Sequence, residues 1–63
     1  MDNEIRHHGY RLRLSTTAEN TWTVEIYAPT GECRETLTFG ERSEAVAEAK
    51  IWVDVQTGRR APA

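Results

Sequence analysis

The chain has 63 residues, which is enough for one domain with one hydrophobic core and makes a catalytic cleft between layers hard to fit. Its hydrophobic content of 38%, with two Trp, two Tyr and one Phe, is typical of a globular protein rather than a disordered one. The formal net charge is -2, and no block of the chain is basic enough to predict nucleic-acid binding from charge alone.

Residues 1–8, MDNEIRHH, predict a lead-in or a short edge extension ahead of a folded core at 9–58. They lack the basic start and apolar run of a signal peptide. Nowhere does the chain reach the roughly 18 consecutive apolar residues of a membrane span. We therefore expect a soluble protein that contacts no membrane.

His7 and His8 are the first residues with metal-binding side chains. Neighbouring side chains in an extended segment point to opposite faces, which is a poor arrangement for holding one ion. A zinc site also needs three or four protein ligands, and Cys33 is the only other Cys or His. We interpret the pair as solvated loop histidines and expect no metal; a metal or pH-sensing role is the minor alternative.

Three segments show the alternation of apolar and polar residues that predicts β-strands: 9–15, 21–28 and 33–39. The second, TWTVEIYA, has the strongest β-branched and aromatic content and is expected at the centre of the sheet. Pro29 and Gly31 between the second and third segments favour a hairpin turn.

Cys33 is the single cysteine, so no intramolecular disulfide can form, and a reducing cytoplasm is the expected location. Its parity in the third segment places it on the inward face with Glu35. We interpret it as a partly buried structural thiol, because a nucleophile needs a base and a positive setting, whereas its neighbours include Glu32 and Glu35.

Residues 43–58, SEAVAEAKIWVDVQTG, predict the one helix, with an apolar stripe suited to packing on a sheet. Ser43 is the predicted N-cap, and Glu41 and Glu44 suit the positive end of the helix dipole. Gly58 is the predicted stop, since it can adopt the left-handed conformation there. Residues 59–63 are expected to form a frayed basic tail.

These elements predict a single α+β domain, a three-stranded antiparallel meander in the order 1-2-3 with one C-terminal helix on one face (βββα). The predicted core comprises Tyr10, Leu12, Leu14, Trp22, Val24, Ile26, Leu37, Phe39, Ala45, Val46, Ala49, Trp52 and Val53.

A second apolar group on the helix, Ala47, Ile51 and Val55, lies away from the core stripe. One interpretation is that Ile51 and Val55 pack against Ile5 or the sheet edge. The other is a homodimer or partner contact, because apolar surface left exposed on a small protein commonly marks association.

The open face of the sheet is the second candidate surface. It carries Arg11, Arg13, Thr23, Arg34 and Thr36, together with Thr21, Glu25, Tyr27 and Thr38. A plain solvated face has the same composition, since antiparallel sheets commonly leave one side wet. Nucleic-acid contact and packing against another protein are the alternatives.

The order of elements resembles the sheet-plus-helix domains of tyrosine integrase N-termini (arm-binding) and of AP2-type plant factors. The segments that carry this resemblance are GYRLRLS, TWTVEIYAPTGE, RETLTF and SEAVAEAKIWV. The resemblance spans roughly residues 9–57 and rests on element order. It implies that the open face enters the DNA major groove, with contacts from Arg11, Arg13, Thr23, Glu25, Arg34 and Thr36.

The run TLTFGERSEAVAEA is also similar to the HicB-type antitoxin domain. That resemblance implies a sheet-and-helix module that pairs with a toxin and oligomerises. Fold analogy of either kind is a prior for function and does not demonstrate it.

Motifs of catalysis are missing from the chain: it has no Gly-rich phosphate loop, no zinc-type spacing and no paired carboxylates at a recognisable distance. We therefore predict a non-enzymatic binding module with no cofactor and no small-molecule substrate. Self-association or a protein partner is the first expectation, and DNA binding through the open face is the alternative.

Overall fold

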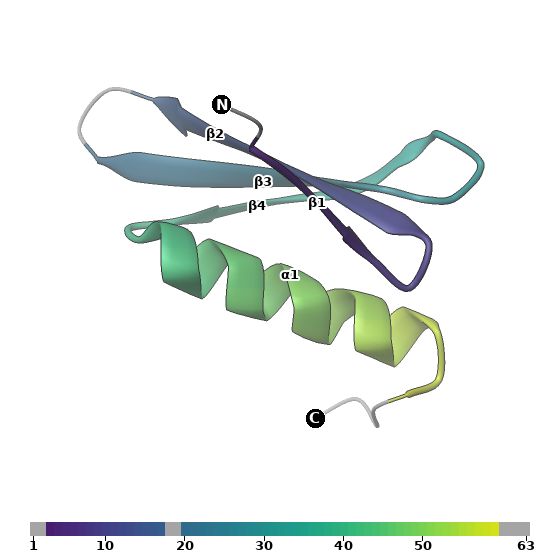
Figure 1. Ribbon diagram of the computed structural model, residues 1–63. Coiled ribbons are helices and arrows are strands. Elements are labelled where there is room, and N and C mark those ends of the chain that lie inside the picture. The colour runs from purple at the N-terminus through teal and green to yellow at the C-terminus, as the bar shows by residue number, and fades with distance from the viewer. Residues whose placement is uncertain (1–2, 18–19, 60–63) are drawn as a thin grey trace.

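The computed structural model describes residues 3–17 and 20–59. Their fold is α+β: a four-stranded antiparallel meander followed by one helix that packs against the sheet (Figure 1). The strands are β1 (Glu4–His7), β2 (Tyr10–Thr17), β3 (Thr21–Tyr27) and β4 (Cys33–Phe39), in the order β1-β2-β3-β4, and the helix is α1 (Arg42–Gln56).

The three-stranded prediction is wrong by one strand, because residues 4–7 pair with β2 instead of preceding the fold. Ile5 lies opposite Leu12, and His7 lies opposite Tyr10. The Leu14 N–H also donates to the Asn3 carbonyl at 2.7 Å, which extends the pairing by one residue. The edge extension was the correct alternative, and the folded core begins before residue 9.

A two-residue turn joins β1 to β2 and explains how so short a strand is held. His8 and Gly9 both have positive φ, 50° and 85°, which is the backbone of the tight hairpin turns that match the twist of antiparallel strands. The turn fixes the register, and Ile5 is thereby brought to the core side of the sheet.

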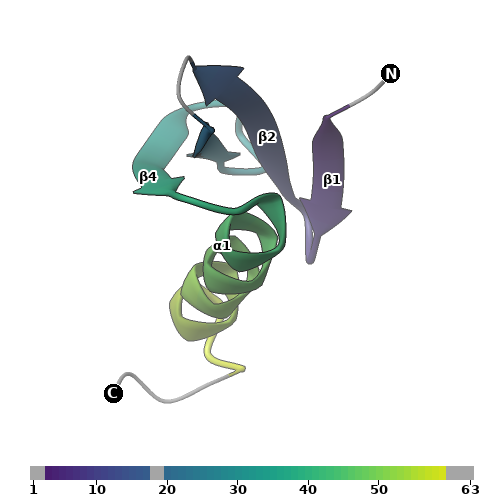
Figure 2. The same ribbon diagram turned by 90° about the vertical axis from the view of Figure 1, so that its left-hand side faces the viewer.

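The core lies between the sheet and α1, which packs against β2, β3 and β4 (Figure 2). Seven of the predicted core residues are buried: Leu12, Leu14, Val24, Ile26, Ala45, Ala49 and Val53. The other six are half-buried and pack against them: Tyr10, Trp22, Leu37, Phe39, Val46 and Trp52. Tyr10 and Trp52 meet edge to face, with ring centroids 6.1 Å apart.

The N-cap of the helix lies two residues earlier than predicted. Glu41 is the N-cap residue and makes no side-chain capping bond, so Ser43 lies inside the first turn and its predicted capping role is wrong. Glu44 does lie in the first turn, where it suits the helix dipole. At the other end Gly58 has φ 77° and its N–H donates to the Val55 carbonyl, which confirms the predicted stop.

An irregularity in β4 overturns the placement of Cys33. Glu35 lies opposite Ile26, but Cys33 lies opposite Tyr27, so Arg34 is an extra residue in a bulge. Because of this extra residue, side chains that precede the bulge point to the opposite face from the one that strand alternation predicts. Cys33 therefore lies on the open face, with its Sγ atom 3.9 Å from Thr36 Oγ1. The thiol is exposed, so the prediction of partial burial is wrong.

The predicted tail at 59–63 lies outside the described residues except for Arg59, whose N–H donates to the Asp54 carbonyl. Within the described part of the chain, no helix is long and apolar enough to cross a membrane.

Candidate binding surfaces

A groove runs between α1 and β4 on the side of the molecule away from β1. It encloses about 320 Å³, and we call it the helix–edge groove. Its lining comprises Leu37, Phe39, Glu48, Ile51, Trp52, Val55 and Gln56. The five apolar members are all half-buried, so each presents part of its hydrocarbon surface to solvent.

Two of the three residues predicted for a partner surface lie in this groove. Ile51 and Val55 line it, whereas Ala47 is exposed and is not part of the lining. The groove places Ile51 and Val55 beside β4, and Ile5 packs on the core from the opposite edge strand. Of the two alternatives for these residues, the sheet edge shares the groove with Ile51 and Val55, whereas Ile5 does not line it. The partner contact stays a prediction.

Sequence reasoning missed the other half of the groove. The sequence predicts Leu37, Phe39 and Trp52 only as core residues, and all three do pack against the core. Because β4 is an edge strand, no further strand in the described part of the chain covers the outer sides of Leu37 and Phe39. The signal that could have revealed this half of the groove is edge position, because the predicted meander already places its third strand at an edge of the sheet.

The open face gathers most of the predicted contact residues. Arg13, Glu25 and Thr36 lie in one row across β2, β3 and β4, and Thr23 lies in the next row opposite Thr38. Arg11 lies opposite Tyr27, and its guanidinium carbon is 5.7 Å from the ring centroid. Most of the predicted contact residues therefore do lie beside one another on the open face of the sheet.

Two features change the charge of this face. β1 adds Arg6 opposite Arg11, and Glu4, whose carboxylate is 4.0 Å from the Arg11 guanidinium. Arg34 lies in the bulge, 3.9 Å from the Glu32 carboxylate. These exposed ion pairs reduce the positive charge that Arg11 and Arg34 offer to a polyanion.

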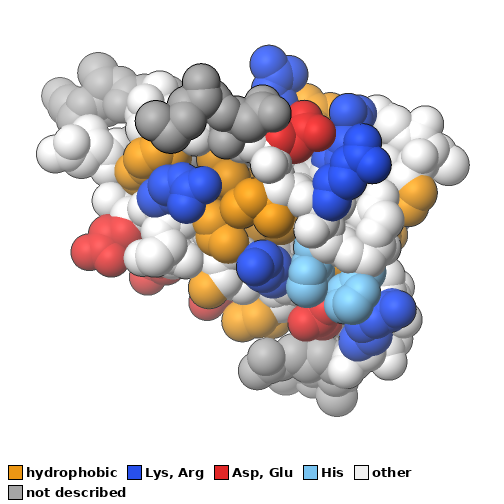
Figure 3. Space-filling view, viewed as in Figure 1, with side chains coloured by type: hydrophobic (Ala, Val, Ile, Leu, Met, Phe, Trp, Pro, Cys, Tyr) orange, Lys and Arg blue, Asp and Glu red, His pale blue; other side chains and the backbone are white. Residues whose placement is uncertain are grey.

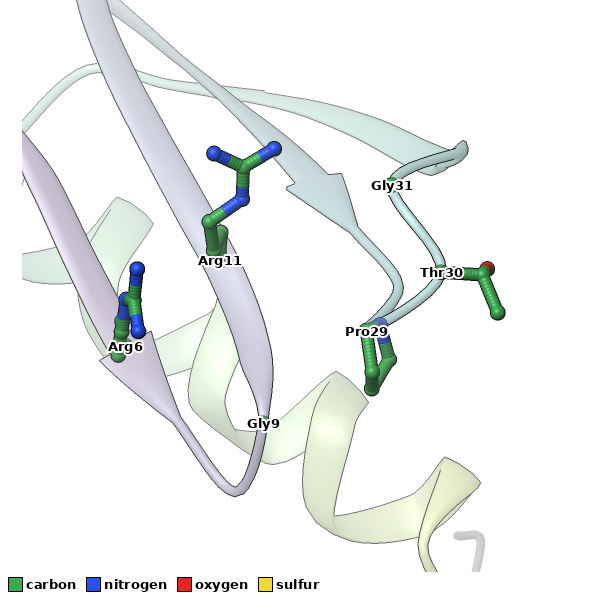
Figure 4. A pocket seen from close by; sticks show the side chains of 6 residues that line it. All are labelled: Arg6, Gly9, Arg11, Pro29, Thr30 and Gly31. Atoms are coloured by element: carbon green, nitrogen blue, oxygen red, sulfur yellow. The ribbon is translucent and has the colours of Figure 1, made fainter.

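A hollow of about 480 Å³ opens on this face at the hairpin turns. It is lined by Arg6, Gly9, Arg11, Pro29, Thr30 and Gly31. Figure 4 shows the Arg6 and Arg11 side chains extending to the same side from neighbouring strands, while Thr30 points away from them. Two guanidinium groups therefore border one hollow, an arrangement suited to an anion.

The third surface is the pair of histidines with Asp54. His7 Nε2 is 2.9 Å from Asp54 Oδ1, and His8 Nε2 is 3.6 Å from the same oxygen. Because a carboxylate only accepts, the imidazole N–H of His7 donates this bond. The expectation that the two side chains point apart is wrong, since His8 lies in the turn rather than in the strand.

Comparison of the chain with protein-family models, curated proteins and solved structures finds no match.

Proposed function

We propose that this protein is a non-enzymatic binding module that acts through self-association, with the helix–edge groove as the contact surface. The observation that carries the proposal is the apolar lining of the groove beside an edge strand. Partly exposed apolar side chains gathered in one groove favour association, because burying them removes hydrocarbon from water.

The edge of β4 supports pairing with another strand. An edge strand presents one row of backbone N–H and C=O groups that a second chain can pair with. The end that borders the groove, Leu37 to Phe39, has strong β-propensity and contains neither Pro nor charge. The bulge, Arg34 and Glu35 protect only the other end.

The opposite edge is less suited to pairing. β1 has four residues, and Glu4 and Arg6 place charges on its open face. Short, charged edge strands resist further pairing. The two edges therefore differ, and association is favoured at β4.

A second copy of the chain is the occupant that this geometry fits. Antiparallel pairing of β4 with its symmetry mate about a two-fold axis perpendicular to the sheet keeps both helices on one face. Ile51 and Val55 of each copy then face the other copy. An interface of about 800 Å² per partner is under a fifth of the 4344 Å² surface of the chain.

Sedimentation velocity on two variants tests the proposal. The double substitution Ile51→Glu and Val55→Glu introduces charge into the groove, and we expect a folded monomer where the unsubstituted chain is a dimer. Ala47→Glu is the matched control, because Ala47 is exposed on the same helix outside the groove, and it should remain dimeric. Circular dichroism checks that each variant is folded; if the double variant is not, Ile51→Gln replaces it.

A chain that stays monomeric at the highest concentration at which it is soluble contradicts self-association. A dimer that survives both substitutions places the interface elsewhere, and that result would also reject the groove.

DNA binding through the open face is the second candidate, favoured by the two arginines at the hollow. This face is on the opposite side of the sheet from α1 (Figure 2), so both functions fit one molecule. A mobility assay at low salt should show binding that is lost on changing Arg11, Arg13 and Arg34 to Ala. Arg42→Ala, on the helix, is the control, and no binding at low salt rejects this candidate.

A further inference from the structure

His7, His8 and Asp54 bring three metal-type donors together from distant parts of the chain. One ligand atom from each lies within 4.8 Å of the other two. His7 ends β1, His8 lies in the following turn, and Asp54 belongs to the last turns of α1. In Figure 3 the two histidines, in pale blue, lie together on the surface next to an acidic side chain.

The spacing of these atoms fits a four-coordinate ion. Zinc bonds of 2.0–2.1 Å in a tetrahedral shell place neighbouring ligand atoms about 3.3 Å apart. The distances of 2.9 Å and 3.6 Å from Asp54 Oδ1 to His7 Nε2 and His8 Nε2 lie on either side of that value. The third separation, between the ligand nitrogens of the two histidines, is no more than 4.8 Å. The His8 side chain is 38% exposed, so its ring has room to turn towards the other two ligand atoms.

The backbone conformation of the β1–β2 turn brings the two histidine side chains together. His8 has φ 50°, in the left-handed region that His, Asn and Asp enter more readily than other residues with a Cβ. This conformation takes His8 out of strand alternation and brings its ring centroid to 4.3 Å from that of His7.

We propose that His7, His8 and Asp54 bind one divalent transition-metal ion of the Zn²⁺ class, with water as the fourth ligand. Two imidazole nitrogens and one carboxylate oxygen suit Zn²⁺ and its neighbours better than Mg²⁺ or Ca²⁺, which prefer shells of oxygen alone. The ion takes the place of the Nε2 proton of His7. The proposal replaces the expectation, drawn from sequence, that the histidines are merely solvated.

The metal connects two elements that otherwise share little contact. α1 packs on β2, β3 and β4, whereas β1 lies at the edge beyond β2. An ion on the three side chains ties the β1–β2 turn to the end of α1, across 47 residues of sequence. Small domains commonly depend on such a cross-link, because their cores are near the lower limit for stability.

Metal titration of the chain, prepared without a polyhistidine tag and stripped by chelation, tests the site. We expect calorimetry to give one Zn²⁺ per chain. At a hundredfold excess over its dissociation constant, Zn²⁺ should raise the melting temperature by about 10–20 °C. Co²⁺ in its place should give the visible absorption of a four-coordinate ion with nitrogen and oxygen ligands.

His8→Asn is the decisive variant, because Asn accepts the left-handed backbone of the turn while removing the imidazole. It should keep the melting temperature of the metal-free chain and weaken Zn²⁺ binding by more than the roughly tenfold to hundredfold that follows loss of a second-shell contact. Asp54→Asn should weaken binding as well. Cys33→Ser and Glu48→Gln are the controls and should leave binding unchanged.

Three outcomes overturn the proposal: no thermal shift with Zn²⁺, undiminished binding by His8→Asn, or loss of binding in Cys33→Ser. The last would show that the exposed thiol, and not the histidine cluster, holds the ion.

Discussion

Gly9 shows how much depends on one residue at the tip of the β1–β2 hairpin. Its φ is 85°, and a Cβ at this position would lie 3.3 Å from Pro29 Cγ. The positive φ strains any residue with a side chain, and the short distance requires Pro29, in the neighbouring β3–β4 turn, to shift. The glycine therefore allows the two turns to approach each other beside the arginine-lined hollow.

We predict that Gly9→Ala lowers the free energy of unfolding by about 1–2 kcal/mol from backbone strain alone, with a further loss from the contact with Pro29. Gly31→Ala is the matched control, since Gly31 has φ 99° but no atom within 4 Å of a built Cβ. Urea denaturation of both variants measures the difference. Equal losses would show that Pro29 moves aside without cost.

The elements differ in how far their sequences determine them. β2 and β3 alternate regularly, so their inward faces and their place in the sheet follow from the apolar pattern. The helix follows from its apolar stripe, and its stop follows from Gly58. These elements are predictable because periodicity is a local property that tertiary contacts reinforce here.

β1, the β4 bulge and the histidine cluster are not predictable in the same way. β1 has one apolar residue, Ile5, so four residues carry no measurable period. The bulge adds Arg34 to β4, and a single extra residue leaves no mark in composition. The contact between His7 and Asp54 joins residues 47 apart in sequence, and only the packed structure brings them together.

β1, the strand that the sequence does not predict, contributes Ile5 to the core. A pair of alanine substitutions measures this contribution. Ile5 is half-buried and packs on the core cluster, whereas Arg6 is exposed on the open face. We predict that Ile5→Ala lowers the free energy of unfolding by about 1–2 kcal/mol, since part of its apolar side chain leaves a packed site. Arg6→Ala should change it by less than about 0.5 kcal/mol.

Chemical denaturation of the two variants in the presence of a chelator gives both values without a contribution from bound metal. If Ile5→Ala is as mild as Arg6→Ala, β1 is not part of the cooperative fold, and residues 4–7 act as a lead-in after all.

At the scale of the whole molecule, one layer of helix covers one face of a sheet and leaves two distinct surfaces. The covered side ends at the helix–edge groove, and the uncovered side carries the arginines and threonines of the open face (Figure 2). The cluster of His7, His8 and Asp54 lies at the β1 side, and the groove lies at the β4 side. The groove and the β1–β2 turn therefore lie at opposite edges of the sheet, whereas His8 of the cluster directly precedes Gly9, which lines the arginine-bordered hollow.

The self-association that we propose through the groove would make stability depend on protein concentration. A chain of 63 residues has a small core, and folding coupled to dimerisation draws on the free energy of association. A hundredfold increase in concentration then adds about 2.7 kcal/mol per dimer, which we expect to raise the melting temperature by about 5–10 °C. Calorimetric scans with a chelator present, over that range of concentration, measure the shift. The Ile51→Glu, Val55→Glu double variant should melt at one temperature throughout, and a melting temperature of the unsubstituted chain that is equally constant would show that the groove stays open to solvent.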